Sequence, residues 1–322
     1  MRNTLSNRFE RTARALLLLG PYLAVLAALA IVLGGCTAPG LAKAEPPDGA
    51  FREQAVQVPA KDLTLSGVLF TPAPSPVLRG RRPAIVLMHG CGGMLDSRGE
   101  LVARHRDWAE RFARWGFVAL TLDSFAPRGI KAICELKDRP IQPWNERTAD
   151  AYAALGYLAA RSDVDPASVF VLGWSHGGST VMGIVRPQAP GRQAGGPHFK
   201  AAVAFYPGCS LPLRQKVYQP TMPLLILHGE ADDWVPAASC VELAQKLKGS
   251  AKPVQTVTYP GAHHGFDAPA TPLRYLPKVY NPAAQGEHGA HIGTHPQARL
   301  AAIAEVRRFV EQGLGPQALA AQ

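Results

Sequence analysis

The sequence lacks the spacings and patches that mark several classes of protein. No Cys-x-x-Cys pair occurs among its five cysteines, so the usual spacing of a structural zinc site is missing. It has neither a collagen-like repeat nor the composition of a disordered chain. Its net charge of +10 is spread over many positions, without a basic stripe or interleaved aromatics, which argues against a nucleic-acid partner. The chain has 322 residues, and 47% of them are hydrophobic, which is enough to bury one large core or two small ones.

The N-terminus carries a clear break in composition. Arginines precede an uncharged stretch over 15–33, and Leu33–Cys36 and more small residues follow it. This order is typical of an export signal. Its last four residues resemble a bacterial lipoprotein signal, in which Cys36 becomes the lipidated first residue; an uncleaved membrane anchor and simple cleavage are the alternatives. All three place the rest of the chain outside the cytoplasm, in the periplasm or cell envelope, with the membrane as a partner through lipid or anchor.

Four segments are expected: an export signal over 1–36, a flexible tether over 37–50, a folded domain over 51–315 and a tail over 316–322. Apolar runs and turn residues predict strands at 56–59, 63–71, 84–88, 117–122, 169–172, 201–206, 224–227 and 254–259. Helical spacings predict helices near 101–115, 145–161, 177–185 and 236–248, and a last one carrying Leu300, Ile303, Val306 and Val310. Repeated strand-then-helix units force parallel pairing, so we expect an α/β fold with a doubly wound sheet. The polar stretch 265–296 is predicted to be a surface loop.

A candidate nucleophile lies between the predicted strand at 169–172 and the next helix. The segment Gly173–Gly178 has the form Gly-x-Ser-x-Gly, with Ser175 at its centre. A tight strand-to-helix turn lifts such a serine above the sheet edge, and glycines are needed because the backbone crowds there. The alternative is an ordinary glycine-rich turn with a solvent-facing serine. The position in the fold favours the nucleophile.

Two later strand ends supply the partners that a serine nucleophile needs. Asp232 follows the strand at 224–227, and His264 follows the strand at 254–259, in the order Ser, Asp, His typical of this turn. The imidazole takes the serine proton and the carboxylate orients the imidazole. Each position has a neighbour of the same type, and we expect Asp233 to bind loop amides and His263 to be a loop side chain.

The tetrahedral intermediate of such a reaction needs hydrogen-bond donors for its oxyanion. One is expected to be the backbone N–H of His176, directly after the nucleophile. The other is expected from the loop after the first buried parallel strand, at Cys91. A plain turn is the alternative for this loop.

Together these motifs resemble the dienelactone hydrolase family. The resemblance spans about residues 55 to 312 and is carried by the segments His89–Gly93, Asp123–Gly129, Gly173–Gly178, Gly229–Asp233 and Tyr259–Phe266. It implies a compact α/β-hydrolase fold without a large lid domain, acting on esters or lactones with no metal or organic cofactor. The enzymes that give the family its name carry cysteine where this chain has Ser175. A general carboxylesterase is therefore expected rather than a hydrolase of dienelactone itself.

Three further side chains are candidates for binding substrate. Arg128 offers a planar fork for a carboxylate, with an ion pair that holds the 124–142 loop as the alternative. Trp174 and Trp234 flank the nucleophile and the acid, and either line a pocket or pack against loops. A metal site at His288, His291 and His295 lacks supporting carboxylates or cysteines, so we expect none.

Four cysteines remain beside Cys36, and an oxidising compartment permits disulfides between them. Three full pairings of Cys91, Cys134, Cys209 and Cys240 are possible. A bridge among the last three is plausible because each follows a predicted strand end, and buried free thiols are the alternative.

Two other functions stay open. The same three residues also serve acyl transfer or peptide cleavage, since pocket shape decides which group accepts the acyl unit. A non-catalytic envelope protein that keeps the fold is the third possibility. The sequence does not determine the oligomeric state.

Overall fold

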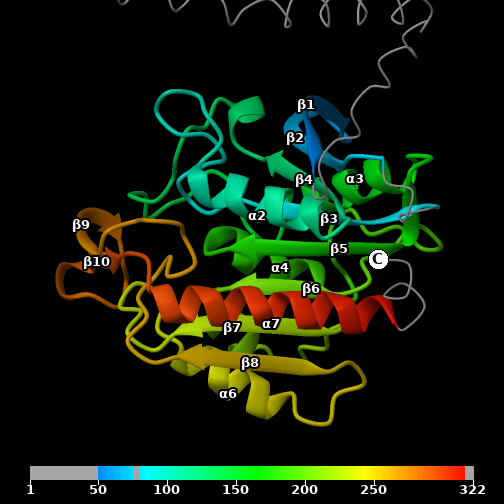
Figure 1. Cartoon of the computed structure of the whole chain (residues 1–322). Helices are drawn as coiled ribbons and strands as arrows, with labels where there is room; N and C mark the ends of the chain where they lie inside the picture. Colours follow the sequence, from blue (N-terminus) through cyan, green and yellow to red (C-terminus); the bar gives the residue numbers. More distant parts are fainter. Residues whose placement is uncertain (1–49, 75–79, 316–322) are drawn as a thin grey trace, which may run out of the picture. The chain divides into compact units, whose positions relative to one another are not determined.

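The computed structural model describes residues 50–74 and 80–315 (Figure 1). The predicted export signal with Cys36, nearly all of the tether and the C-terminal tail lie outside the described residues. Within the described part, no helix is both long and apolar enough to cross a membrane.

A sheet of eight strands forms the centre of the domain, in the order β1-β2-β4-β3-β5-β6-β7-β8. The strands are β1 (Phe51–Pro59), β2 (Thr64–Pro72), β3 (Arg82–Met88), β4 (Val118–Asp123), β5 (Val164–Trp174), β6 (Ala202–Phe205), β7 (Leu224–Gly229) and β8 (Val254–Tyr259). The β1–β2 hairpin joins β4 in antiparallel fashion, and β4, β3 and β5 to β8 are parallel. This is the α/β-hydrolase arrangement expected from the sequence.

Helices cover both faces of the sheet. They are α2 (Ala103–Arg114), α3 (Glu146–Ala159), α4 (His176–Ile184), α5 (Ser210–Arg214), α6 (Ala238–Lys246) and α7 (Pro296–Leu314), with short 3₁₀ helices η1 (Ala126–Arg128) and η2 (Gln285–Glu287). Successive side chains of a strand point to opposite faces. Accordingly Ile85 and Leu87 of β3 pack with α2 and α7, whereas Val86 and Met88 pack with α3 and α4. Figure 1 shows α2 and α7 in front of the sheet.

The stretch 265–296 differs from the expected surface loop, because it contains the hairpin β9 (Arg274–Tyr280) and β10 (His288–Ile292). Most of β9 is exposed and it contains Pro277, and β10 is short with Gly289 inside, so neither strand shows an apolar alternation. The hairpin lies at the end toward which the parallel strands point (Figure 1).

The four cysteines of the domain form two disulfides, Cys91–Cys134 and Cys209–Cys240. The second is a bridge of the kind expected among the last three cysteines. The first includes Cys91, which was left out of the single bridge favoured from the sequence. It ties the loop after β3 to the loop after β4, and a small apolar cluster with Phe125, Ile133 and Trp234 packs beneath these loops.

Candidate active site

Ser175 occupies a strained turn between β5 and α4. Its φ is 54° and its ψ is −113°, a region that non-glycine residues rarely adopt. The turn is crowded as well: a Cβ on Gly173 would lie 2.2 Å from the carbonyl oxygen of Gly177, and one on Gly177 would lie 2.1 Å from that of Met88. The serine side chain is half-buried. The fold therefore pays conformational strain to hold one hydroxyl at the end of the central strand.

The structure joins Asp232 to His264 rather than using their neighbours. His264 Nδ1 lies 2.8 Å from Asp232 Oδ2, and both side chains are buried. The other carboxylate oxygen accepts the amides of Trp234 and Val235 at 3.0 and 2.8 Å, which fixes the carboxylate in its loop. Burial acts to raise the pKa of Asp232, but the neighbouring His264 and His228 and the hydrogen bonds to the carboxylate together outweigh burial, and the pKa lies below its ordinary value. Asp232 is thus an ionised group placed to hold the imidazole.

Asp233, one residue on, has a different partner. It is exposed and receives both the backbone amide and Nδ1 of His291, at 2.9 and 2.7 Å. The loop amides expected for it are bound by Asp232 instead. The structure thus separates the two adjacent carboxylates by partner and by burial.

Aromatic rings enclose the imidazole of His264. Its ring centroid lies 4.4 Å from that of Tyr206 and 4.8 Å from that of Trp234. Its carbonyl accepts the amide of Gly293, just after β10, at 3.1 Å. Within the described residues, Ser175 Oγ makes no hydrogen bond to His264. Such bonds are often long without substrate and tighten in the substrate complex.

The two backbone groups expected to bind an oxyanion lie on neighbouring loops. His176 is the first residue of α4, where backbone N–H groups have no partner within the helix. The loop that carries Cys91 touches this turn, since a Cβ on Gly177 would also lie 2.6 Å from the carbonyl oxygen of His89. The N–H of Cys91 itself makes no hydrogen bond among the described residues.

Arg147, a residue that the sequence analysis missed, joins these two loops. Its guanidinium lies 2.8 Å from Nδ1 of His176 and donates to the carbonyl of His89 at 2.7 Å. Burial lowers the pKa of Arg147 to about 9, so it remains charged at neutral pH. Burial, together with the charge of Arg147, lowers the pKa of His176 well below its ordinary value. The imidazole is therefore neutral, and its Nδ1 accepts a hydrogen bond from the guanidinium of Arg147.

A signal for Arg147 was present in the sequence. It lies four, eight and eleven residues before Ala151, Leu155 and Leu158, and so on the inward side of the predicted helix. A charged side chain on a buried helical face requires a polar partner inside the protein. The sequence does not identify that partner, because His89 and His176 lie far away along the chain.

A second buried polar group lies behind Ser175 and His264. Asp267 is fully buried and accepts hydrogen bonds from Trp108, Trp174 and Tyr206, the first two at 2.9 and 2.8 Å. Tyr206 also receives a hydrogen bond from Arg104 at 3.0 Å. The network connects the residue before the nucleophile to the ring that packs against His264.

The three candidate substrate-binding side chains have different surroundings. Arg128 forms a two-pronged ion pair with Asp150 of α3, at 2.8 and 2.9 Å, so its fork is already occupied. Trp174 is fully buried and bound to Asp267, which corresponds to the packing alternative. Trp234 is the one of the three that contacts a triad candidate, through the ring of His264.

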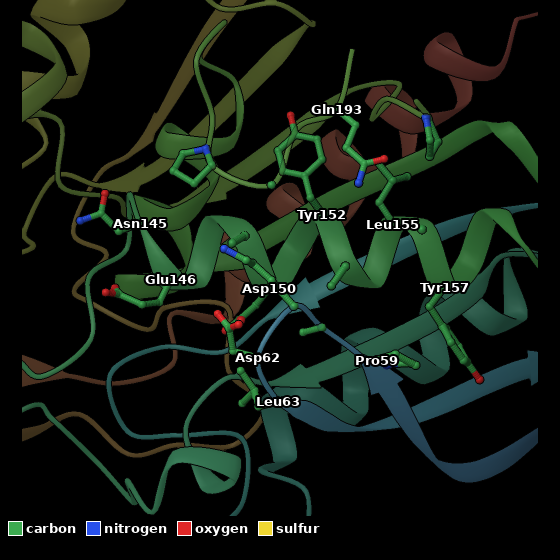
Figure 2. Close-up of a pocket in the computed structure, with 18 of the residues that line it drawn as sticks. Pro59, Asp62, Leu63, Asn145, Glu146, Asp150, Tyr152, Leu155, Tyr157 and Gln193 are labelled. Carbon is green, nitrogen blue, oxygen red and sulfur yellow. The ribbon is translucent and has the colours of Figure 1, made fainter. Parts of the chain in front are cut away.

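The largest of the cavities described lies away from Ser175, Asp232 and His264. Its volume is about 1190 Å³, and the β1–β2 turn, α3 and residues of the 190–197 segment line it (Figure 2). Arg128 and Asp150 are among its lining residues, whereas Ser175, Asp232 and His264 are not. The largest cavity and the candidate reactive side chains therefore lie in different places. The candidate active site is assigned to the strained serine and its partners, because reactivity depends on them.

Comparison with known proteins adds a family and a fold. The model of the dienelactone hydrolase family matches residues 65–292. A putative dienelactone hydrolase from Klebsiella pneumoniae is similar in structure, with a TM-score of 0.59 and 17% identity over 81% of this chain and 98% of that one. A propionate-bound esterase from Thermogutta terrifontis gives 0.55 and 21%, over 81% and 94%. A dienelactone hydrolase-like promiscuous phosphotriesterase from metagenomic libraries gives 0.55 and 19%, over 82% and 98%.

The relatives found by sequence match a smaller part of this chain than these three structures do. Uncharacterized proteins from two strains of Mycobacterium tuberculosis are each 28% identical over 202 residues. The match covers 58% of this chain and 64% of the length of each relative.

Proposed function

The chain belongs to the dienelactone hydrolase family, and from this premise we propose that it hydrolyses carboxylic ester or lactone bonds through Ser175, His264 and Asp232. The observation that carries the proposal is the 2.8 Å contact between His264 Nδ1 and the ionised Asp232, in a chain that also holds Ser175 on a strained turn at the end of β5. Since Nδ1 is engaged, Nε2 is the ring nitrogen available to accept a proton from the serine.

The reaction follows from these roles. Ser175 Oγ attacks the carbonyl carbon while its proton passes to His264 Nε2, and the carbonyl oxygen becomes an oxyanion. The bond to the leaving alkoxide then breaks, and the imidazolium returns the proton to that oxygen. Water next attacks the acyl-enzyme, giving its proton to His264, which passes it back to Ser175 as the acid leaves. Asp232 stabilises the imidazolium in both halves of the cycle.

The oxyanion of each tetrahedral intermediate is proposed to bind the backbone N–H groups of His176 and Cys91. Fixed donors in a site that excludes water stabilise such a charge strongly, because they need no rearrangement as the charge develops. The neutral, hydrogen-bonded His176 ring supports this role by holding the first residue of α4 in place. The disulfide Cys91–Cys134 supports it on the other loop.

Paired substitutions test the proposal, because the chain provides a neighbour of the same type for two of the three residues. With a short-chain p-nitrophenyl ester, Ser175→Ala is expected to abolish turnover, whereas Ser250→Ala, in an exposed turn before β8, retains it. His264→Ala is expected to lower kcat at least as strongly as Asp232→Asn, for which we expect about 10⁴-fold. His263→Ala and Asp233→Asn should leave kcat within a few-fold of the wild type.

A covalent probe separates a hydrolase from a binding protein that keeps the fold. A fluorophosphonate is expected to label the wild type but not Ser175→Ala. Unlabelled protein that is folded by circular dichroism would refute the assignment of Ser175. Full turnover by the Ser175→Ala variant would refute it as well.

A further inference from the structure

Three side chains that commonly ligate metals meet beside the proposed triad. They are Asp233, His263 and His291, and one nitrogen or oxygen atom of each lies within 4.8 Å of the others. Asp233 directly follows Asp232, and His263 directly precedes His264. His291 comes from β10 of the hairpin that the sequence did not predict. The cluster therefore forms only when the hairpin docks on the two loops.

Two of the three side chains already contact each other. His291 Nδ1 lies 2.7 Å from Asp233 Oδ2, and the backbone amide of His291 donates to Asp233 Oδ1 at 2.9 Å. About 40% of each side chain is exposed, so an ion can reach them from solvent. The carboxylate and the imidazole thus hold each other in place without being sealed off.

His263 completes the set and has a polar atom without a partner. Its Nδ1 is buried and makes no hydrogen bond in the described structure. Its ring centroid lies 5.5 Å from that of His291. A buried nitrogen without a hydrogen-bond partner is costly in a folded protein. An ion bound by the imidazole of His263 would provide this side chain with a polar partner.

Two imidazoles and one carboxylate are the ligands that zinc uses where one coordination position stays open. Ligand atoms 2.0–2.2 Å from a tetrahedral ion lie about 3.3 Å apart. To match this spacing, the Asp233–His291 contact would have to lengthen slightly, and His263 would have to move closer by rotation of its side chain. The three histidines His288, His291 and His295 lack a carboxylate ligand among themselves. Asp233 supplies that carboxylate.

We propose that Asp233, His263 and His291 bind one divalent transition-metal ion of the zinc type. The proposal departs from the sequence-based expectation that His288, His291 and His295 bind no metal, because it pairs His291 with other ligands. The proposal is independent of the proposed function, since none of the three ligands is a member of the triad.

The ion would fasten the hairpin to the loops of the triad. Backbone and side-chain hydrogen bonds already connect them: Trp234 donates to the carbonyl of Tyr280 at 2.9 Å, and Asn281 donates to that of Asp233 at 2.8 Å. A metal adds a further connection, to the residue before His264. We therefore expect the ion to stabilise the folded domain against heat, by binding the native arrangement alone.

Zinc titration of the full chain, free of any histidine tag and treated with chelator, tests the proposal. All proteins carry Cys36→Ser, because that thiol is itself a zinc ligand. Isothermal calorimetry is expected to show one Zn²⁺ per chain with a Kd of about 10 μM or below. The same addition is expected to raise the Tm.

Three variants and one control make the outcome specific. His263→Ala, His291→Ala and Asp233→Asn are each expected to weaken zinc binding about a hundredfold. Asp233→Asn keeps an oxygen for the amide of His291, so its effect does not depend on unfolding. His288→Ala, exposed on the same strand, should bind as the parent does. A parent Kd weaker than about 1 mM, or equal binding by folded forms of all three variants, would overturn the proposal.

Discussion

At the scale of single residues, buried charge distinguishes this site from an ordinary strand-to-helix turn. Arg147 is fully enclosed, and its partners are a neutral imidazole and a carbonyl rather than a carboxylate in direct contact. Enclosing a guanidinium costs free energy unless its donors are well matched. Its position across the two loops proposed to bind the oxyanion, those of Cys91 and His176 (the proposed oxyanion loops), gives a reason for that cost. We conclude that it holds these loops at a fixed spacing.

Replacing Arg147 tests this role. Arg147→Met is expected to lower kcat for an ester about 10- to 100-fold with little change in KM, because the oxyanion donors lose their fixed spacing. It should also lower the free energy of unfolding by about 3 kcal/mol, since His89 and His176 lose a partner. Steady-state kinetics and urea unfolding measure the two effects.

Arg186→Met provides the comparison. Arg186 also donates to backbone carbonyls and lies over Trp144, but it contacts neither of the proposed oxyanion loops. The Arg186→Met variant should therefore have a lower free energy of unfolding and an unchanged kcat. An equal loss of kcat in both variants would show that Arg147 has only a general structural role.

His105 makes the domain sensitive to acid. Burial, together with the charge of Arg104, lowers the pKa of His105 from 6.5 to about 3. Between these values the unfolded chain binds a proton that the folded chain does not, so stability falls as the pH drops from 6.5 toward 3. His105→Gln should reduce that slope by up to about 1.4 kcal/mol per pH unit. Urea unfolding at pH 6 and pH 4 measures it, with the exposed His288→Gln as control; an unchanged slope in His105→Gln contradicts the prediction.

At the scale of elements, two covalent links act on different parts of the domain. Cys209–Cys240 joins α5 to α6 across 31 residues, and Cys91–Cys134 joins the loops after β3 and β4 across 43. Only the second lies on a proposed oxyanion loop. The two links should therefore separate stability from activity.

Removing each disulfide in turn checks this separation. Cys209→Ala with Cys240→Ala should lower the free energy of unfolding by about 3 to 4 kcal/mol, because the unfolded chain gains freedom, and should leave kcat nearly unchanged. Cys91→Ala with Cys134→Ala should cost a similar free energy and lower kcat as well. Unfolding curves and ester kinetics on both double variants provide the measurement. A full kcat in the second would exclude the proposed role of that bridge.

At the scale of the whole molecule, the two disulfides are in keeping with an oxidising compartment. We propose export with lipid on Cys36, which would place the hydrolase domain at the cell envelope. Residues 37–49 would then separate the domain from the membrane.

Lipid attachment has a direct readout. The mature wild-type protein should begin at Cys36 with the mass of a diacylglycerol and should sediment with membranes. Cys36→Ser should lose that mass. Mass spectrometry of the N-terminal peptide and fractionation of cells measure both effects. A mature wild-type N-terminus without lipid would contradict the proposal.

Local patterns determined much of this protein. Uninterrupted apolar runs such as 84–88 specify strands covered on both faces, and the crossover helices specify their parallel direction. The order of Ser175, Asp232 and His264 after three strands also follows from the sequence, because the carboxyl ends of parallel strands meet at one edge. Each strand and each of the three motifs depends on residues only a few positions apart. A single sequence therefore contains the information needed to predict them.

Contacts between distant segments were decided by the tertiary structure. Asp232 was chosen over Asp233 from its place in the sequence, but which of the two adjacent carboxylates turns inward to His264 is a tertiary feature. The two disulfide pairings, the partners of Arg147 and the occupied fork of Arg128 all join residues more than twenty positions apart. The β9–β10 hairpin is local, but its docking against Asp233 and His264 is a contact between distant segments. Sequence specifies which groups need partners through burial and charge. Only the packed chain decides which partners they meet, because three-dimensional proximity depends on every element in between.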